Sequence, residues 1–401
     1  MMIQWLLYTV LLVFGFVWQG RSLRCSKSLS HTQYRRPGRV LTAATRTLSE
    51  QIVNLVMESP LKRPIVGMAR NTMVKTAKAA GLEWDVLAAK LVLSMGGREA
   101  IEKQAKMIQE EHGDSRVPVY YEKPFHGYDL GNLEVMAAVE QEIAGKAVGA
   151  RNFPSEGLKG EEVLRNSYSR EIESLCGSSI FKACSEGSLI VDGGCGSGTS
   201  SRFLSRLFPA SRVVGFDLSP FMIAVGRHIS SGAVNDFWME RVEKEQQQRV
   251  ELKFGDIADT KLPTASATIV SLSLVLHELP AEATRQVVRE AFRILKPGGV
   301  LLIMEMDPQA PGYVKLRNNA ALFSILRSTE PWLDEYFTLA PRLPEELQGV
   351  GFSSVKLSAA TGRHFVIAAS KPGVLDVRPS VEDRLKQDMH LNTLKMDVKR
   401  G

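Results

Sequence analysis

The sequence predicts an α/β fold in which helices cover both faces of a mostly parallel sheet, preceded by a helical N-terminal extension. Short apolar segments alternate with helical segments from residue 161 to residue 303, which is the pattern of a doubly wound parallel sheet. The segment Leu189–Thr199 joins an apolar run to a ladder of glycines. Such a strand–helix turn is typical of a site for a nucleotide-type cofactor.

The first element is a strand over Leu189–Val191 followed by a helix over Thr199–Leu207. The apolar run has the length and composition of a fully buried parallel strand. Between the two elements lie Gly194, Gly196 and Gly198, whose missing Cβ atoms let a ligand lie directly against the backbone. The alternative is a purely structural turn in another α/β protein.

The residues around the glycines indicate which cofactor binds. A dinucleotide fingerprint needs a Gly or Ala three positions after Gly196, to pack helix against strand, and this chain has Thr199 there. Asp192 stands at the strand end, where a carboxylate is a poor neighbour for a pyrophosphate. It suits a cofactor with an ammonium and a sulfonium and no phosphate.

The second strand, Arg212–Asp217, is also apolar and also ends in an acid. Asp217 lies 23 residues after Gly194, close to the ~20 expected for a carboxylate that accepts hydrogen bonds from a ribose diol. Ser219 and Pro220 then begin a helix, with Ser as the cap and Pro as the first helical residue.

The third strand, Val250–Phe254, alternates polar and apolar residues and ends at Gly255-Asp256-Ile257. Asp256 at that edge is placed to accept a hydrogen bond from an adenine amino group. An ordinary turn-forming Gly-Asp pair is the alternative.

Residues of roughly 160–371 resemble a class I S-adenosylmethionine-dependent methyltransferase. The matching segments follow one another in the family's order: Asp192–Gly198, Asp217, Gly255–Asp256, Thr268–Pro280 (TIVSLSLVLHELP) and Leu295–Ile303 (LKPGGVLLI). The resemblance implies a Rossmann-like, seven-stranded, mostly parallel sheet, S-adenosyl-L-methionine as cofactor, and methyl transfer as the reaction. Among subfamilies, the core resembles the ubiquinone/menaquinone C-methyltransferase-like group and uncharacterised methyltransferases of plants and cyanobacteria.

The cofactor-binding residues expected from these matches share the carboxyl ends of the first three strands: Asp192, Gly194, Gly196, Gly198, Asp217, Leu218, Asp256 and Ile257. The expected catalytic residue is His277, at the end of the fourth strand beside the cofactor. A base is needed only when the acceptor must lose a proton. The alternative for His277 is a loop residue that orders the edge of the cofactor site. Glu278 is the candidate to orient His277. Glu305 and Asp307, at the end of the fifth strand, are further acids expected to face the same crevice, with helix capping or lid contact as the favoured role of each.

Two aromatic segments are candidates for acceptor contact. Tyr120–Tyr128 predicts either an acceptor-facing wall or a strap that packs two parts of the chain together, and the acidic, aromatic insert 328–346 predicts either acceptor contact or lid packing. The candidate residues are Tyr121, His126, Glu330, Trp332 and Tyr336.

Charge and motifs favour a small-molecule acceptor and no nucleic acid. Seven of the 50 basic residues and none of the 44 acidic residues lie in 1–49, so the net charge of +6 belongs to the leader and supplies no nucleic-acid patch on the rest of the chain. Val275–Glu278 replaces the Asn/Asp-Pro-Pro-Tyr/Phe motif of amino-methylating DNA enzymes and carries one glutamate, where protein arginine methyltransferases carry two. The seven His show no metal-ligand spacing. The leading acceptor is a quinone, a prenyl-lipid or a pigment precursor. The alternatives are a nicotinamide-dependent oxidoreductase and a non-catalytic S-adenosylmethionine-binding protein.

The chain divides into four predicted parts: a targeting leader at 1–49, a helical extension at 50–160, the methyltransferase domain at 161–371 and a polar tail at 372–401. Residues 3–18 form an uncharged apolar run of signal-peptide length, and residues 21–46 are Arg- and Ser/Thr-rich, as in transit peptides. This bipartite character predicts a plastid, with the secretory pathway, a membrane anchor or the mitochondrion as alternatives. Membrane association is expected only through the leader.

Local patterns predict the remaining elements. In the extension, a cap at 47–50 begins one helix, Met73, Ala77 and Ala80 share a helix face, Gly81 breaks the helix, and Trp84, Leu87 and Leu91 continue the pattern. Residues 100–109 predict a third helix. Beyond the fifth strand we expect one helix over 313–326 and a closing antiparallel strand pair at 355–357 and 364–369.

Overall fold

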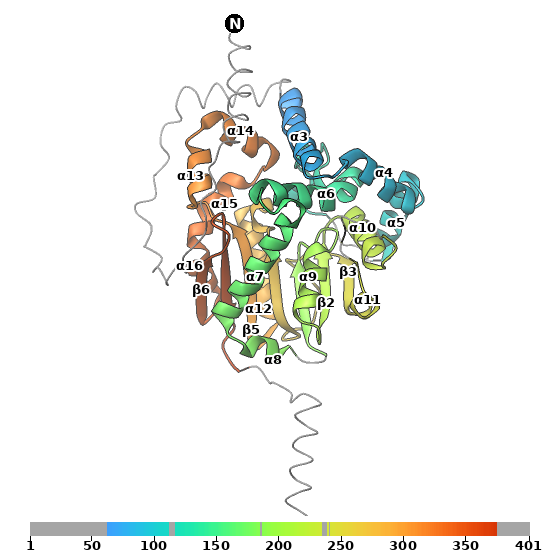
Figure 1. Cartoon of the computed structure of the whole chain (residues 1–401). Helices are drawn as coiled ribbons and strands as arrows, with labels where there is room; N and C mark the ends of the chain where they lie inside the picture. The colour runs from blue at the N-terminus through green and yellow to red at the C-terminus, as the bar shows by residue number, and fades with distance from the viewer. Residues whose placement is uncertain (1–61, 112–116, 185–186, 235–238, 240, 375–401) are drawn as a thin grey trace, which may run out of the picture.

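The computed structural model describes residues 62–111, 117–184, 187–234, 239 and 241–374 (Figure 1). The leader, the helix start predicted at 47–50 and most of the polar tail lie outside the described residues. The described helices are α3 Lys62–Ala79, α4 Trp84–Ser94, α5 Arg98–Glu111, α6 Val135–Asn152, α7 Gly160–Cys176, α8 Ser179–Ala183, α9 Thr199–Leu207, α10 Pro220–Ser230, α11 Lys244–Arg249, α12 Ala281–Ile294, α13 Pro311–Arg317, α14 Ala320–Thr329, α15 Leu333–Leu339 and α16 Leu343–Val350. Short 3-10 turns are η2 Val119–Glu122, η3 Gly131–Leu133, η4 Gly157–Lys159, η5 Leu276–Glu278 and η6 Ala340–Arg342.

A seven-stranded sheet forms the centre, as the sequence predicts. Its strands are β1 Leu189–Gly193, β2 Arg212–Asp217, β3 Val250–Phe254, β4 Ala267–Ser273, β5 Leu295–Met306, β6 Ser354–Ala359 and β7 His364–Ser370. They lie in the order β3-β2-β1-β4-β5-β7-β6. The first five are parallel, and β7 runs antiparallel to both of its neighbours. The fold is α/β and mostly parallel, and the closing antiparallel pair is confirmed.

Alternate residues of the central strands pack into different layers, because successive side chains of a strand point to opposite faces. In β4, Ile269 joins a cluster with the side chains of α7, α8 and α9, whereas Val270 joins a cluster with those of α12, α15 and α16. In Figure 1, α7 crosses one face of the sheet while α12 lies behind it. Since both faces are covered, the central strands are buried along nearly their whole length, and the buried Ser271 hydroxyl of β4 is satisfied by a hydrogen bond with the Tyr168 hydroxyl.

The helical extension packs at the β3 edge of the sheet. Trp84, Leu87 and Leu91 of α4 are buried in one cluster with residues of α5, α6, α10 and β3. Gly81 has a positive φ of 91° at the break between α3 and α4, as the sequence predicts. The extension lies beside α10 and above the β3 side of the sheet in Figure 1, which brings it near the end of β1.

One expectation after the fifth strand is wrong. The single helix predicted over 313–326 is two helices, α13 and α14, separated at Asn318 and Asn319. The Asn318 amide closes α13 by donating to the Val314 carbonyl, and the Phe323 amide donates to the Asn319 carbonyl to open α14. Two consecutive asparagines favour helix ends over helix interiors because their side chains compete for backbone hydrogen bonds.

The strand order reverses at the carboxyl edge of the sheet, beside β1. From β1 the chain proceeds outward to β2 and β3, then crosses to β4 on the opposite side of β1. Open α/β sheets bind ligands where the strand order reverses in this way. The loops after β1 and β4 therefore flank the expected site.

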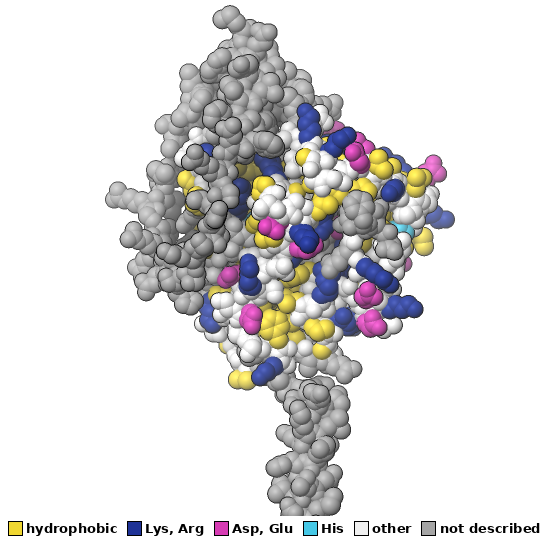
Figure 2. Space-filling model, viewed as in Figure 1, with side chains coloured by type: hydrophobic (Ala, Val, Ile, Leu, Met, Phe, Trp, Pro, Cys, Tyr) yellow, Lys and Arg dark blue, Asp and Glu magenta, His cyan; other side chains and the backbone are white. Residues whose placement is uncertain are grey.

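The face shown in Figure 2 carries basic and acidic side chains interspersed, with hydrophobic side chains between them. Among the described residues, no helix is both long and apolar enough to cross a membrane.

Candidate active site

The glycine loop needs glycine for two reasons. Gly194, Gly196 and Gly198 have φ angles of 66°, 53° and 86°, a region that residues with a Cβ rarely adopt. A Cβ at Gly196 would also lie 2.2 Å from Gln141 Nε2, and one at Gly194 would lie 2.1 Å from Val275 Cγ2. The loop therefore approaches both the extension and the loop after β4 too closely for any side chain.

Asp192 is buried beneath this loop, with 1% of its surface exposed. Its Oδ2 accepts hydrogen bonds from the hydroxyls of Ser200 and Ser201, both at 2.6 Å. Burial raises the pKa of Asp192 to about 6, against these two hydroxyls, which lower it. Its Oδ1 has no hydrogen-bond partner among the described residues. A buried oxygen without a donor fits the ammonium that the sequence argument assigned to the cofactor.

Asp217 holds the second strand end to the glycine loop. Its Oδ2 accepts a hydrogen bond from the Gly196 amide at 2.8 Å, and its Oδ1 accepts from the Ser219 amide at 2.8 Å and the Tyr121 hydroxyl at 3.0 Å. The Leu218 amide also acts on this carboxylate. A carboxylate offers about four acceptor positions, so a ribose hydroxyl would take the place of one of these donors, and the Tyr121 hydroxyl is the one that comes from a side chain. Ser219 caps α10 by accepting from the Met222 amide, as predicted.

The residues predicted for the adenine side are two buried apolar residues and one acid. Leu218 and Ile257 are 7% and 9% exposed. Asp256 Oδ1 accepts from the Ala258 amide at 2.8 Å, which leaves its Oδ2 for an external donor. The pKa of Asp256 is raised because the carboxyl is partly buried.

The segment 119–133, which we name the strap, crosses above these acids. The Tyr121 hydroxyl donates a hydrogen bond to Asp217. The pKa of Tyr120 is raised by burial and by the charge of Asp256. The two consecutive tyrosines therefore lie near the two acids predicted to bind the cofactor, Tyr121 near Asp217 and Tyr120 near Asp256. Asn132 anchors the strap by accepting from Ser219 Oγ at 2.6 Å through its carbonyl. Tyr121, expected beside the acceptor, therefore lies against the ribose-side carboxylate.

His277 is paired with Glu305 across the ends of β4 and β5. Its Nδ1 lies 2.9 Å from Oε1 and 3.0 Å from Oε2 of Glu305. Glu305 is fully buried and also accepts from the amides of Leu276 and Met306. Burial lowers the pKa of His277, but the carboxylates around the ring, Glu305 first and then Glu330 and Glu278, together outweigh burial and raise it to about 10. The Glu305 carboxylate fixes the ring and makes its other nitrogen a stronger base.

The loop that carries His277 is strained. Leu274, directly after β4, has a φ of +59°, which costs a residue with a branched side chain about 1–3 kcal/mol. Its amide donates to the Met304 carbonyl at 2.8 Å. The turn directs the chain from the sheet into η5, where His277 meets Glu305.

The insert 328–346 contacts the strap through Glu330. Glu330 Oε1 lies 2.9 Å from His126 Nε2 of the strap, and the His126 amide donates to the Thr329 carbonyl. Tyr336 is buried with its ring edge-on to His277 at 6.1 Å. Trp332 is half-buried, and its carbonyl accepts a hydrogen bond from the Tyr336 amide at the start of α15. Of the five acceptor candidates, Tyr121 and His126 belong to the strap, Glu330 contacts the strap, and Tyr336 contacts His277. The fifth, Trp332, lies at the start of α15.

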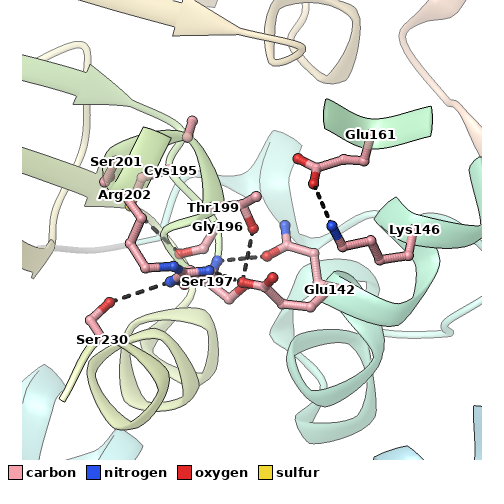
Figure 3. A network of polar contacts seen from close by, with 12 residues as sticks. Glu142, Lys146, Glu161, Cys195, Gly196, Ser197, Thr199, Ser201, Arg202 and Ser230 are labelled. Atoms are coloured by element: carbon pink, nitrogen blue, oxygen red, sulfur yellow. Dashed lines mark hydrogen bonds and ion pairs between the residues drawn. The ribbon is translucent and has the colours of Figure 1, made fainter. Parts of the chain in front are cut away.

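Sequence reasoning missed the role of α6. Glu142 accepts from Thr199 Oγ1 at 2.8 Å and Ser197 Oγ at 3.2 Å, and it forms a buried ion pair with Arg202 (Figure 3). Gln141 Oε1 accepts from the Ser197 amide at 2.6 Å. These partners are more than 50 residues apart in the chain, so no local pattern reveals them.

Known proteins that are similar to this chain bear on the choice between the two cofactors. Residues 190–299 match the model of a methyltransferase domain family. Mouse acetylserotonin O-methyltransferase is 28% identical over 209 residues, which are 51% of this chain and 50% of that protein. Demethylmenaquinone methyltransferase of Listeria monocytogenes is 28% identical over 191 residues, 44% of this chain and 75% of that protein. Residues 190–299 thus carry a methyltransferase domain, and the chain is similar to S-adenosylmethionine-dependent methyltransferases.

The cofactor of this family is S-adenosyl-L-methionine, in agreement with the Thr199 and Asp192 argument and against a nicotinamide cofactor. The chain spans about half the length of the mouse and rat relatives. Among solved structures, a Haemonchus contortus phosphoethanolamine N-methyltransferase 2 bound to S-adenosyl-L-methionine matches with a TM-score of 0.34 and 15% identity over 52% of this chain and 60% of that one. Among the described residues, no cluster of three or more His, Cys, Asp or Glu could hold a metal ion.

Replacing Asp217 by Ala should weaken S-adenosylhomocysteine binding at least tenfold. The ribose would lose a charged acceptor worth roughly 1.5–3 kcal/mol, and the Gly196 amide would lose its partner. Isothermal titration calorimetry of the full chain measures this. Asp259→Ala, at an exposed acid beyond β3, is the control. An unchanged affinity for Asp217→Ala would disprove the ribose assignment.

Proposed function

We propose that this protein transfers a methyl group from S-adenosyl-L-methionine to a small molecule by in-line displacement. The observation that carries the proposal is the meeting of two groups at one sheet edge. The glycine loop, tied to Asp217, is the cofactor half, and the buried His277–Glu305 pair is the half that handles a proton.

The cofactor supplies a methyl group already activated by a sulfonium. The work of the chain is therefore mainly alignment, an orientation effect that can contribute ~7–11 kcal/mol. Asp192, Asp217 and Asp256 hold the two ends of the cofactor, and the strap covers it. When the acceptor is a hydroxyl, the His277 ring nitrogen that does not face Glu305 takes its proton, while Glu305 keeps the ring in place.

We propose a quinone, a prenyl-lipid or a pigment precursor as the acceptor. Two matched relatives support a small organic acceptor, since their names specify acetylserotonin and demethylmenaquinone. The small-molecule choice is also supported by the motif replacement at Val275–Glu278 and by the near-neutral charge of the chain beyond the leader.

The test uses the purified full chain with methyl-labelled S-adenosyl-L-methionine and a fractionated extract of plastid-containing cells. We expect label to partition into organic solvent, where chromatography identifies the product. Label in protein or in the aqueous phase would reject the lipid-like acceptor. Cofactor binding without any transfer would favour the non-catalytic alternative.

We also propose that residues 1–49 direct the chain to a plastid, and that any membrane association arises through this leader. The support is its acid-free, bipartite composition. A fluorescent protein fused after residue 49 should accumulate in plastids of an alga with complex plastids. Secretory or mitochondrial fluorescence would select one of the alternatives.

A further inference from the structure

Glu330 is a buried acid with one oxygen left free. The residue follows α14, and 7% of its surface is exposed. Its Oε1 bonds His126 of the strap, but its Oε2 has no hydrogen-bond partner among the described residues. An unsatisfied buried acceptor costs about 1–3 kcal/mol, and more when it is charged. The free oxygen therefore marks a place for a donor from outside the chain.

Glu330 belongs to one group of side chains with His277, Glu278 and His126. The charge of Glu330 acts on both His277 and Glu278. Glu278 accepts from Asn132 Nδ2 at 3.0 Å, so it faces the strap as Glu330 does. Glu305 stands behind His277. This group of side chains thus brings together the carboxyl groups of Glu278 and Glu330 and the imidazoles of His126 and His277, with Glu305 buried behind His277.

Charge decides which acceptor this group of side chains admits. Each imidazole is already paired with a carboxylate, His277 with Glu305 and His126 with Glu330. A carboxylate or phosphate on the acceptor would meet Glu278 and Glu330. Two guanidiniums, those of Arg151 and Arg363, act on Tyr313 together with Glu330, but neither forms an ion pair with Glu278 or Glu330 among the described residues. Like charges repel strongly in a water-poor site, whereas a hydroxyl or amino group would satisfy the free oxygen.

We propose that Glu330 Oε2 accepts a hydrogen bond from a hydroxyl or amino group of the methyl acceptor, and that the acceptor carries no negative charge at this end. This proposal rests on the proposed function, because it names the acceptor class for the same site. Glu330 is then a specificity-determining residue, distinct from the proton-accepting His277.

The test measures binding to the full chain with S-adenosylhomocysteine present, so that it needs no turnover. The probes share one ring system: 2-naphthol, 2-(aminomethyl)naphthalene, 2-methoxynaphthalene and 2-naphthoate. We expect at least one of the two donor probes to bind tenfold or more tighter than the methoxy and carboxylate probes. The tighter of the two identifies the hydroxyl or the amine as the preferred donor. Naphthoate binding as tightly as the donor probes, or donor probes binding no better than 2-methoxynaphthalene, would overturn the proposal.

Two variants assign the preference to Glu330. Glu330→Gln removes the charge and keeps the shape, so the discrimination against naphthoate should fall at least tenfold. Glu345→Gln makes the same charge change at an exposed position of α16 and should leave it unchanged. Equal discrimination in wild type and Glu330→Gln would contradict the assignment. If Glu330→Gln does not fold, the probe series on the wild-type chain still tests the proposal. Absence of S-adenosylhomocysteine binding to the wild-type chain would contradict the proposed function instead.

Discussion

Replacing His277 by Asn should lower kcat for a hydroxyl acceptor by about 10²–10⁴-fold, the usual contribution of a general base, when the rate is measured near pH 10, where the ring begins to be neutral. The affinity for S-adenosylhomocysteine should change less than twofold, because His277 contacts none of the three cofactor acids in the described hydrogen bonds. Single-turnover methyl transfer and calorimetry together measure both quantities. A full rate in His277→Asn would leave His277 the role of ordering the loop, the alternative reading of its position.

The pH profile separates a base from a structural residue. With a pKa of about 10, His277 is protonated at neutral pH, so the wild-type rate should rise with pH until the ring is neutral. Glu305→Gln removes the charge that raises the pKa of His277, and the rising limb should shift toward its ordinary value of 6.5. An identical profile in both proteins would show that His277 does not take the proton.

The same pair makes stability depend on pH in a defined direction. The pKa of His277 is raised, so its contribution to stability is complete below its ordinary value of 6.5 and is lost as the pH rises through about 10. The pKa of Glu305 is lowered, with His277 outweighing burial, so its contribution is present above 4.5 and is lost as the pH falls through the lowered value. The thermal midpoint should therefore decline from about pH 6.5 toward 10 in wild type and less in His277→Asn.

Replacing Glu142 by Ala should lower the free energy of unfolding by about 3 kcal/mol and weaken S-adenosylhomocysteine binding. The change leaves the buried Arg202 guanidinium without its carboxylate, and losing one partner of a buried ion pair costs about 3–5 kcal/mol. Arg202 keeps the Ser197 carbonyl and the Ser230 hydroxyl as acceptors (Figure 3), which places the loss at the lower end. Urea unfolding and calorimetry measure the two effects.

Two further variants check the cause. Glu173→Ala changes an exposed acid of α7 and should shift the free energy of unfolding by less than about 0.5 kcal/mol. Glu142→Met combined with Arg202→Met removes both charges and should recover more than half of the loss. A double variant as unstable as Glu142→Ala would mean that packing, and not an unpaired charge, causes the effect.

The sheet and the cofactor residues could be predicted because their signals are local. Each strand end carries its own candidate residue: Asp192 near the end of β1, Asp217 at the end of β2 and Asp256 after β3. Parallel strands bring these ends to one edge, so a correct strand assignment also assembles the site. The strained Leu274 turn gave no signal, because its φ depends on the packing of β4 against β5 and not on its own side chain.

Contacts between distant segments could not be predicted. Tyr121 and Asp217 are 96 residues apart, and His126 and Glu330 are 204 residues apart. Their residue types suggested acceptor contact, but which carboxylate each one meets depends on how the strap crosses the sheet edge. By contrast, the helix break at Asn318 and Asn319 could have been predicted from the sequence, since asparagine is a poorer helix former than most residues.

The brace from α6 has a consequence for dividing this enzyme into parts. The family match begins at residue 190, whereas Gln141 and Glu142 hold the glycine loop from outside that span. A fragment that starts at the matched region would keep the Arg202 cation and discard the carboxylate that neutralises it. Grafting this core onto another chain, or swapping it with a relative's, would therefore transfer the glycine motif without the means to hold it in shape.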